Sequence, residues 1–165
     1  MSSTLRQATD ADAAAIAALH NAVADDLTSR FGKGHWSYQA SERGVLYDVR
    51  ISTVLVEEDE SGITGTFKLG TRKPWAIDTS YFTPVTRALY LQSMAVRPDL
   101  QRRGAGRRLL EHARLVAEEW PSDAIRLDAY DADAGAGEFY AKCGFSEVGR
   151  AEYRGTALIY YELVL

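Results

Sequence analysis

The sequence contains little cysteine and histidine, and this scarcity excludes two classes of site. Cys143 is the only cysteine in the 165 residues, so an internal disulfide is impossible and a thiolate metal site is not expected. His20, His35 and His112 lie far apart and lack the spacing of metal ligands. The sequence therefore predicts neither a disulfide framework nor a bound metal.

Net positive charge and long apolar runs are also missing. The formal net charge is -4 at pH 7, whereas proteins that bind nucleic acid usually carry a basic face. No segment approaches the roughly 18 to 20 consecutive apolar residues of a membrane span, and residues 1–16 lack the basic start and apolar core of a signal peptide. We therefore expect no nucleic-acid partner, no membrane association and a cytoplasmic location.

The composition that remains is typical of one folded domain. Hydrophobic residues make up 46% of the chain and charged residues 25%, which are ordinary values for a globular protein. A chain of this length is long enough for one compact domain and too short for two of ordinary size. We therefore expect a single domain over residues 1–165.

The hydrophobic pattern predicts a mixture of strands and helices. Asp10 is expected to cap the first helix, and loops are expected at 29–41 and 71–85, with a turn at 150–155. The predicted helices after the first are 42–51, 106–120 and 134–143. The predicted strands are 4–9, 53–58, 63–70, 87–96, 124–130, 145–149 and 157–165. This order predicts an α/β or α+β fold with a mixed sheet, in which 87–130 forms a parallel β-α-β unit.

One glycine-rich segment stands out at the start of the helix in that unit. "RPDLQRRGAGRRLL" (97–110) joins a buried strand to an amphipathic helix, whose first amide N–H groups lack partners within the helix. Those donors and the helix dipole favour an anion such as a phosphate. Gly104 and Gly106 would let it approach the backbone, and Arg102, Arg103 and Arg107 could assist. The alternative is a tight turn whose arginines form a solvated face, with Arg108 among them.

Two common phosphate-binding motifs do not fit this segment. A P-loop needs Gly-Lys followed by Ser or Thr, but Gly32-Lys33 is followed by Gly34. A dinucleotide-binding motif needs a third glycine where this chain has Leu109. A nucleotide-binding domain of either kind is therefore the weakest of the hypotheses for this loop.

Two segments together resemble the GCN5-related N-acetyltransferases (GNAT family). "MAVRPDLQRRGAGRRLL" (94–110) is similar to the family's Gln/Arg-x-x-Gly-x-Gly/Ala motif, with Gln101, Gly104 and Gly106 at its key positions. "DADAGAGEFYAKCGF" (131–145) resembles the family's later Phe-Tyr helix that ends in Gly-Phe. Close matching runs from about 88 to 149. The resemblance implies a mixed, mostly antiparallel sheet with helices on both faces and a parallel β-α-β unit that carries the acetyl-CoA loop.

The resemblance also implies which residues bind acetyl-CoA, the expected co-substrate. The strand before the loop would pair with the pantetheine arm, and the loop would hold the pyrophosphate. Asp133 stands where the family often has Asn; it could still cap the helix, although a carboxylate cannot donate a hydrogen bond to that arm. The implied acetyl-CoA residues are Met94, Ala95, Val96, Arg102, Arg103, Gly104, Ala105, Gly106, Arg107 and Asp133.

For catalysis, the resemblance implies that Tyr140 protonates the departing thiolate, while the alternative for this tyrosine is a packing role. Acetyl transfer by direct attack of an amine needs no nucleophilic cysteine, and we expect Cys143 to be a packed thiol. The proton acceptor is not identified, because Gln92 lies in the region where the family often has glutamate. The candidates are Glu57, Glu58, Asp78, Asp128 and His35.

The expected function is therefore an acetyl-CoA-dependent N-acetyltransferase that acts on a primary amine of a small molecule or peptide. The alternative is a non-catalytic acyl-CoA-binding or sensing module. The acceptor is expected between loops 29–41 and 71–85, whose aromatic residues could instead anchor these loops or form a dimer interface. These residues are Phe31, Trp36, Tyr38, Trp75, Tyr81 and Phe82. The resemblance also allows a homodimer, which no residue in the sequence requires.

Overall fold

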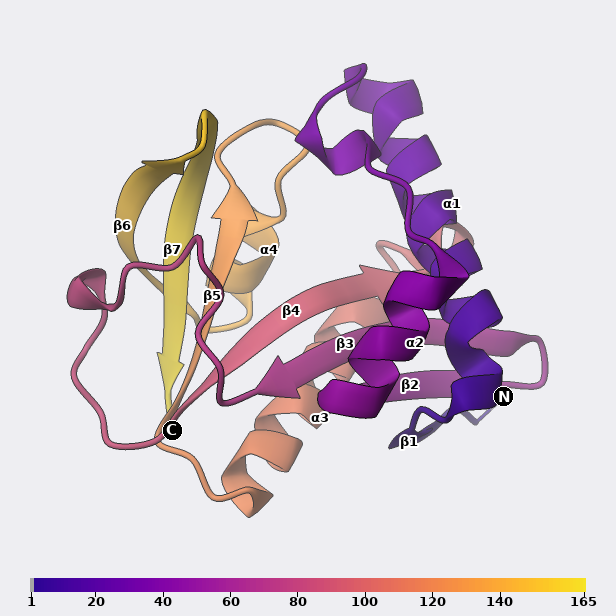
Figure 1. Cartoon of the computed structure of the whole chain (residues 1–165), viewed down its shortest axis with the longest axis horizontal. Coiled ribbons are helices and arrows are strands. Elements are labelled where there is room, and N and C mark those ends of the chain that lie inside the picture. Colours follow the sequence, from indigo (N-terminus) through magenta and orange to yellow (C-terminus); the bar gives the residue numbers. More distant parts are fainter. Residues whose placement is uncertain (1) are drawn as a thin grey trace. The chain divides into compact units, whose positions relative to one another are not determined.

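A computed structural model describes residues 2–165 of the chain. The described chain divides into two compact units, one formed by residues 2–69 and 92–113, the other by residues 70–91 and 114–165. Strand β4 (Ala88–Val96) and helix α3 (Ala105–Glu119) each contribute to both units (Figure 1). The expectation of a single domain over residues 1–165 stays a prediction.

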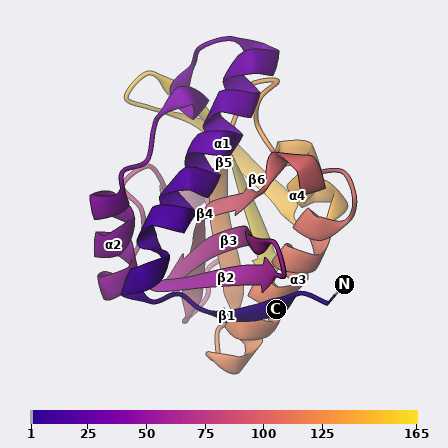
Figure 2. The same ribbon diagram turned by 90° about the vertical axis from the view of Figure 1, so that its right-hand side faces the viewer.

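The first unit is built on an antiparallel group of strands. It contains β1 (Thr4–Gln7), α1 (Ala13–Phe31), α2 (Glu42–Ile51), β2 (Thr53–Asp59) and β3 (Gly62–Gly70). Strand β2 pairs antiparallel with both β1 and β3. Apolar residues of α1 and α2, such as Ile16 and Val45, pack with Val54 and Val56 of β2. Figure 2 shows α1 and α2 on one face of these strands, and the start of α3 lies on the other face.

The second unit contains the remaining strands. They are the first part of β4, β5 (Ala124–Tyr130), β6 (Ser146–Tyr153) and β7 (Thr156–Val164), and helix α4 (Gly137–Lys142) precedes β6. Strand β5 pairs parallel with β4 and antiparallel with β7, and β6 pairs antiparallel with β7. The predicted parallel pairing of the strands before and after α3 is therefore confirmed.

The strands of the described chain follow the order β1-β2-β3-β4-β5-β7-β6 in a seven-stranded sheet. Strands β4 and β5 pair in parallel. The pairs β1–β2, β2–β3, β5–β7 and β6–β7 are antiparallel. This arrangement confirms the expected mixed, mostly antiparallel α/β fold. No helix within residues 2–165 is long and apolar enough to cross a membrane.

Two adjacent tyrosines on β7 define the two faces of the second unit, because successive strand residues point to opposite sides. Tyr160 packs with Ile77 and Phe82 of the segment 71–87, which covers one face. Tyr161 lies on the other face, where its hydroxyl comes so close to Gly137 of α4 that a Cβ there would meet it at 2.5 Å. A larger residue at Gly137 would therefore require the Tyr161 side chain or α4 to shift.

The first helix starts differently from the prediction. Asp10 does not cap it: residues Asp10–Asp12 form a short 3-10 turn before α1, and Asp12 accepts a hydrogen bond from the Thr9 amide at 2.8 Å. Asp10 instead forms an ion pair with Arg50. At its other end α1 continues to Phe31, so it includes the first residues of the predicted loop 29–41.

Two predictions near the carboxyl end are also wrong. Strand β6 continues through most of the predicted turn 150–155 and ends at Tyr153, because Arg154 and Gly155 alone make the hairpin turn with positive φ angles of 49° and 82°. Helix α4 begins only at Gly137 with Ala136 as its N-cap residue, so Asp133 does not cap it. A Cβ at Gly135 would lie 1.9 Å from the Tyr130 carbonyl oxygen, which shows how tight this connection is.

Candidate active site

The loop between β4 and α3 is held in a defined turn by its own residues. A 3-10 turn at Pro98–Leu100 follows β4, and the Gln101 side chain donates a hydrogen bond from Nε2 to the Val96 carbonyl at 2.9 Å. Arg102 and Gly104 then adopt left-handed backbone conformations with φ angles of 62° and 83°. Left-handed residues within such a turn direct neighbouring amide N–H groups toward one point, which is the geometry of an anion nest.

The start of α3 has three features that are typical of an anion-binding site. The first helical hydrogen bond runs from the Arg108 amide to the Gly104 carbonyl at 3.0 Å, so the amides of Ala105 and Gly106 precede the hydrogen-bonded ladder. A Cβ built on Gly104 would meet no heavy atom within 4 Å. The side chains of Arg102, Arg103 and Arg107 are exposed in this region. The loop thus offers backbone donors, open space and nearby positive charge.

Arg108 is partly exposed, as the alternative of a solvated arginine expects, but it also forms an ion pair. Its Nη2 donates to Glu57 Oε1 at 2.8 Å, and Glu57 on β2 is only 2% exposed. The ion pair ties the first turn of α3 to β2, whose pairing with β3 is irregular between Glu57 and Glu58. Glu57 is therefore committed to Arg108, which removes it from the candidates for a proton acceptor.

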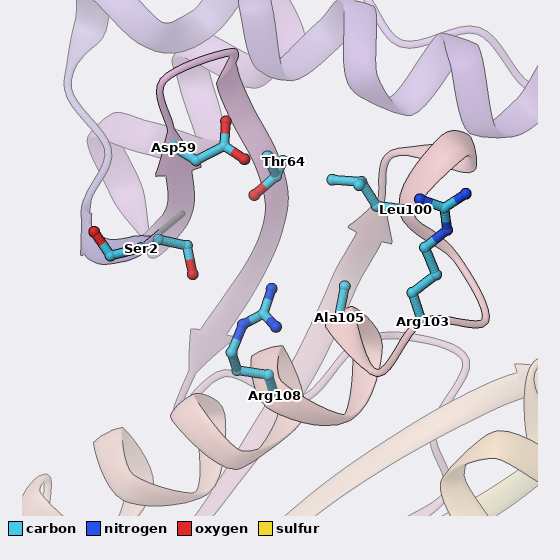
Figure 3. Close-up of a pocket in the computed structure, with 8 residues that line it drawn as sticks. Ser2, Asp59, Thr64, Leu100, Arg103, Ala105 and Arg108 are labelled. Carbon is cyan, nitrogen blue, oxygen red and sulfur yellow. The ribbon is translucent and has the colours of Figure 1, made fainter.

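A pocket of about 420 Å³ lies beside this loop in the first unit. Figure 3 shows Arg103 and Arg108 on the α3 side of the pocket, and Asp59 and Thr64 on the β2–β3 side. The lining residues are Ser2, Ser3, Asp59, Thr64, Leu100, Arg103, Ala105 and Arg108. Both signs of charge are present, so the pocket shows no clear preference for an anion.

The strand before the loop carries an irregularity that the sequence did not reveal. Ser93 in β4 has a φ of 53°, an unusual value for a non-glycine residue inside a strand. Ala95 and Val96 beyond it are buried, while Met94 is half-buried. The predicted pantetheine residues therefore follow directly after a local break in the regular strand.

Tyr140 lies on α4 among aromatic rings. Its ring centroid is 5.4 Å from Phe139, 5.8 Å from Phe145 and 6.2 Å from Tyr161. Burial raises the pKa of the Tyr140 phenol well above its usual range, and the nearby charge of Asp128 adds to this effect. The phenol therefore stays protonated at any physiological pH, as a proton donor must.

The other candidates for a proton acceptor differ sharply in their surroundings. Glu58 forms an ion pair with Arg6, and Asp78 accepts hydrogen bonds from the amide and hydroxyl of Ser80. His35 is an exposed residue of a 3-10 turn. Asp128 on β5 is half-buried, and burial raises the pKa of its carboxyl group. It has no hydrogen-bond or ion-pair partner among residues 2–165.

The aromatic residues of the two predicted loops do not behave as one group. Phe82 is buried against Tyr90 and Tyr160, which supports its alternative role as an anchor of segment 71–85. Trp36 is half-buried and donates from Nε1 to the Gly32 carbonyl at 2.9 Å. Tyr38 and Trp75 are each 82% exposed, so these two side chains remain available for contacts.

A buried polar network holds segment 71–87 on the second unit, and the sequence analysis missed it. Glu162 on β7 accepts hydrogen bonds from the Thr83 amide and hydroxyl at 3.1 and 2.5 Å. Arg126 on β5 donates to the Thr83 carbonyl at 2.8 Å and to the Tyr90 hydroxyl at 3.1 Å. The signal was the presence of Arg126 and Glu162 inside two largely apolar strands, "AIRLDAY" and "ALIYYELVL".

Comparison with known proteins agrees with this fold. A family model described as an acetyltransferase (GNAT) domain matches residues 50–147, more than half of the chain. The chain therefore belongs to the GNAT acetyltransferase family. The predicted enzyme class and the use of acetyl-CoA as co-substrate are thereby confirmed for the family. No curated protein matches the chain.

Solved structures support the same architecture at low sequence identity. A GNAT-family acetyltransferase from Listeria monocytogenes is 22% identical, with a TM-score of 0.74 over 98% of this chain and 95% of that one. The yncA protein of Salmonella typhimurium, solved with its cofactor acetyl-CoA, is 20% identical, with a TM-score of 0.71 over 99% and 94%. The ribosomal-protein-alanine N-acetyltransferase of Brucella melitensis is 20% identical, with a TM-score of 0.70 over 98% and 99%. These likenesses show the fold.

Proposed function

We propose that this chain is an acetyl-CoA-dependent N-acetyltransferase that moves an acetyl group to a primary amine of a small molecule or peptide. The observation that carries the proposal is the start of α3. There Arg102 and Gly104 adopt left-handed conformations, and the space beside Gly104 is open. A cytoplasmic location and a homodimer stay predictions.

In this proposal the loop recognises the pyrophosphate mainly through its backbone. The amides between Arg102 and Arg107 would hold the phosphate oxygens, because helix-start amides and the helix dipole favour negative charge. The side chains of Arg102, Arg103 and Arg107 would add positive charge. Met94, Ala95 and Val96 would bind the pantetheine arm, and Asp133 would lie along it.

Bound acetyl-CoA would supply a thioester carbonyl as the electrophile. Backbone amides of the chain would polarise the carbonyl oxygen, and Tyr140 would donate a proton to the departing sulfur. A thiol has a pKa of about 8.5 and a phenol one of about 10, so the proton would pass to the sulfur only as the C–S bond breaks, and the phenol would regain a proton from the attacking nitrogen. This role requires the Tyr140 hydroxyl rather than its ring.

The direct test is incubation with acetyl-CoA and a library of amines while thiol release is measured. We expect release with at least one amine, and a loss of about 100-fold in kcat for Tyr140→Phe. Tyr161→Phe, which changes a neighbouring ring in the same way, is the matched control and should lose little. Tight CoA binding without transfer to any amine would favour a non-catalytic acyl-CoA-binding module instead.

A further inference from the structure

The pocket beside the start of α3 has a negatively charged wall, which pyrophosphate binding by the loop does not explain. Its lining comes from residues 2–3, the β2–β3 hairpin and the segment 100–108, all of which belong to the first unit. Its volume of about 420 Å³ lies within the range of about 300–1,000 Å³ that is typical of small-molecule sites. The pocket is therefore large enough for a ligand of its own.

A β-bulge in the hairpin shapes one wall of this pocket. The pairing of β2 with β3 is irregular between Glu57 and Glu58, which leaves Thr64 of β3 without a partner on β2. The Thr64 hydroxyl donates to the Glu57 carbonyl at 3.2 Å, and the Thr64 carbonyl accepts from the Arg97 amide at 2.9 Å. A bulge bends its strand and redirects the neighbouring side chains. These hydrogen bonds hold the wall in place without a ligand.

Asp59 gives this wall a fixed negative charge. It ends β2, is half-buried, and accepts hydrogen bonds at Oδ1 from the amide and the hydroxyl of Ser61. These bonds lower the pKa of the Asp59 carboxyl group, which favours its charged form. The nearby Arg97 donates to Asp99 and to the Ser61 hydroxyl. Asp59 forms no ion pair within residues 2–165, so this wall can bind a positive charge.

The opposite side of the pocket carries positive charge (Figure 3). Arg108 is paired with Glu57 through Nε and Nη2, so these two charges compensate each other. Arg103 is exposed and has no hydrogen-bond or ion-pair partner within residues 2–165. Leu100 and Ala105 add apolar surface to the lining. The pocket therefore offers one unpaired carboxylate, one unpaired guanidinium and an apolar surface.

This pattern selects against ligands of a single charge. Asp59 repels an anion and Arg103 repels a cation, whereas a molecule that carries both charges is attracted to both walls. Figure 3 shows Asp59 and Arg103 on opposite sides of the pocket, so the two charges of a matching ligand lie several bonds apart. Leu100 and Ala105 favour methylene groups over polar atoms between these charges, because burying a polar atom without a partner is costly.

We propose that this pocket binds an ω-amino acid, a linear zwitterion whose ammonium group contacts Asp59 and whose carboxylate contacts Arg103. The site is separate from acetyl transfer, and its occupation does not require acetyl-CoA. Arg103 cannot hold the ligand carboxylate and assist the CoA pyrophosphate at once, so each ligand weakens the binding of the other by the same factor. This coupling, unlike the site itself, rests on the proposed acetyl-CoA loop.

The test uses 5-aminopentanoate as the probe and NMR of the backbone amides in the protein without CoA. The Thr64 and Ala105 amide signals should shift in a saturable way. The zwitterion should bind about fivefold more tightly than pentanoate or n-pentylammonium at equal ionic strength. Glycylglycine should bind more weakly than 5-aminopentanoate, because peptide atoms replace the methylenes. Equal affinities for the three pentyl compounds, tighter binding of glycylglycine, or shifts that miss both amides would overturn the proposal.

Paired variants then separate the two charges, again without CoA. Asp59→Asn keeps an acceptor for Ser61 and should bring the affinity for 5-aminopentanoate close to that for pentanoate in the same variant. Glu60→Gln removes an exposed charge from the same hairpin turn and should change little. Arg103→Gln should weaken binding about fivefold, whereas Arg102→Gln, at an exposed position outside the pocket lining, should not. An unchanged affinity in Asp59→Asn or Arg103→Gln would contradict the proposed contacts.

Calorimetry of CoA with and without saturating 5-aminopentanoate tests the coupling. CoA affinity should fall a few fold when the pocket is occupied, and this effect should vanish in Arg103→Gln. An unchanged CoA affinity would reject the shared use of Arg103. A protein that binds 5-aminopentanoate at Thr64 and Ala105 but does not bind CoA would support the pocket and reject the proposed function. CoA binding without any binding of 5-aminopentanoate would do the reverse.

Discussion

The start of α3 and the middle of β5 use charge in opposite ways. At the α3 start, left-handed residues, helix amides and exposed arginines collect positive charge, and the one buried carboxylate nearby, Glu57, is neutralised by Arg108. In β5 the half-buried carboxylate of Asp128 lies opposite Tyr160 and has no hydrogen-bond or ion-pair partner within residues 2–165. The first region has the features of an anion site, whereas the second carries a negative charge that no ion pair within residues 2–165 balances. The difference shows that pairing, more than burial, separates structural carboxylates from candidates for function.

The largest expected effect comes from placing a carboxylate at the α3 start. Gly104→Glu adds negative charge and bulk in the open space beside Gly104, so CoA affinity should fall more than about 100-fold, or roughly 3 kcal/mol. Gly104→Ala is the control, because both variants force a side chain onto a φ of 83° at a cost of about 1–2 kcal/mol. It should lose less than about tenfold. Calorimetry with CoA measures both, and equal affinities for the two variants would refute the anion nest.

A smaller effect is expected from breaking the structural pair. Arg108→Ala leaves Glu57 buried without its partner, which we expect to lower the free energy of unfolding by about 2 kcal/mol. This is less than for a fully buried pair, because the Arg108 side chain is 48% exposed. Urea unfolding measures the change.

The control for that experiment is Arg107→Ala, which truncates the exposed neighbouring arginine on the same helical turn. It should lower the free energy of unfolding by less than about 0.5 kcal/mol, because the interactions of an exposed arginine are weak, and it should weaken CoA binding only modestly. If Arg108→Ala and Arg107→Ala have equal free energies of unfolding, the buried Glu57 carboxylate does not need Arg108 as a partner. The contrast between a paired Glu57 and an unpaired Asp128 would then no longer hold.

The two regions also differ in how far the sequence could predict them. The loop and its helix were predictable because their signals are local: Gln101, Gly104 and Gly106 lie within six residues, and Pro98 follows the strand. The Glu57–Arg108 pair joins residues 51 apart, and no local pattern reveals it. The helix start was misassigned although Thr9 and Asp12 have the spacing of a capping box. Ser93 and its positive φ carry no sequence signal at all.

The same limit explains why Asp128 was one of five candidates in the sequence. Glu57, Glu58, Asp78 and Asp128 are alike as residue types, and only tertiary partners separate them. Arg108 and Arg6 engage the two glutamates, while Ser80 engages Asp78. The sheet register places Asp128 opposite a tyrosine instead of an arginine. Sequence pattern predicts which strand a carboxylate lies on, but its partner comes from a distant part of the chain.

The smallest expected effect has the opposite sign from the others. Burial raises the pKa of Asp128 in the folded chain, so ionising this carboxyl group lowers stability as pH rises from its unfolded pKa to its folded pKa, and the full penalty persists above that range. Asp128→Asn should therefore stabilise the protein at neutral pH by up to about 1 kcal/mol. The gain should disappear in acid below the ordinary aspartate pKa of about 3.9.

Urea unfolding of both proteins across this pH range measures the gain, with Glu152→Gln as the control for lost negative charge. If Asp128 had a structural partner, as Glu57 has, the Asn substitution would lower the free energy of unfolding instead. A less stable Asp128→Asn variant would therefore remove the contrast between the two regions.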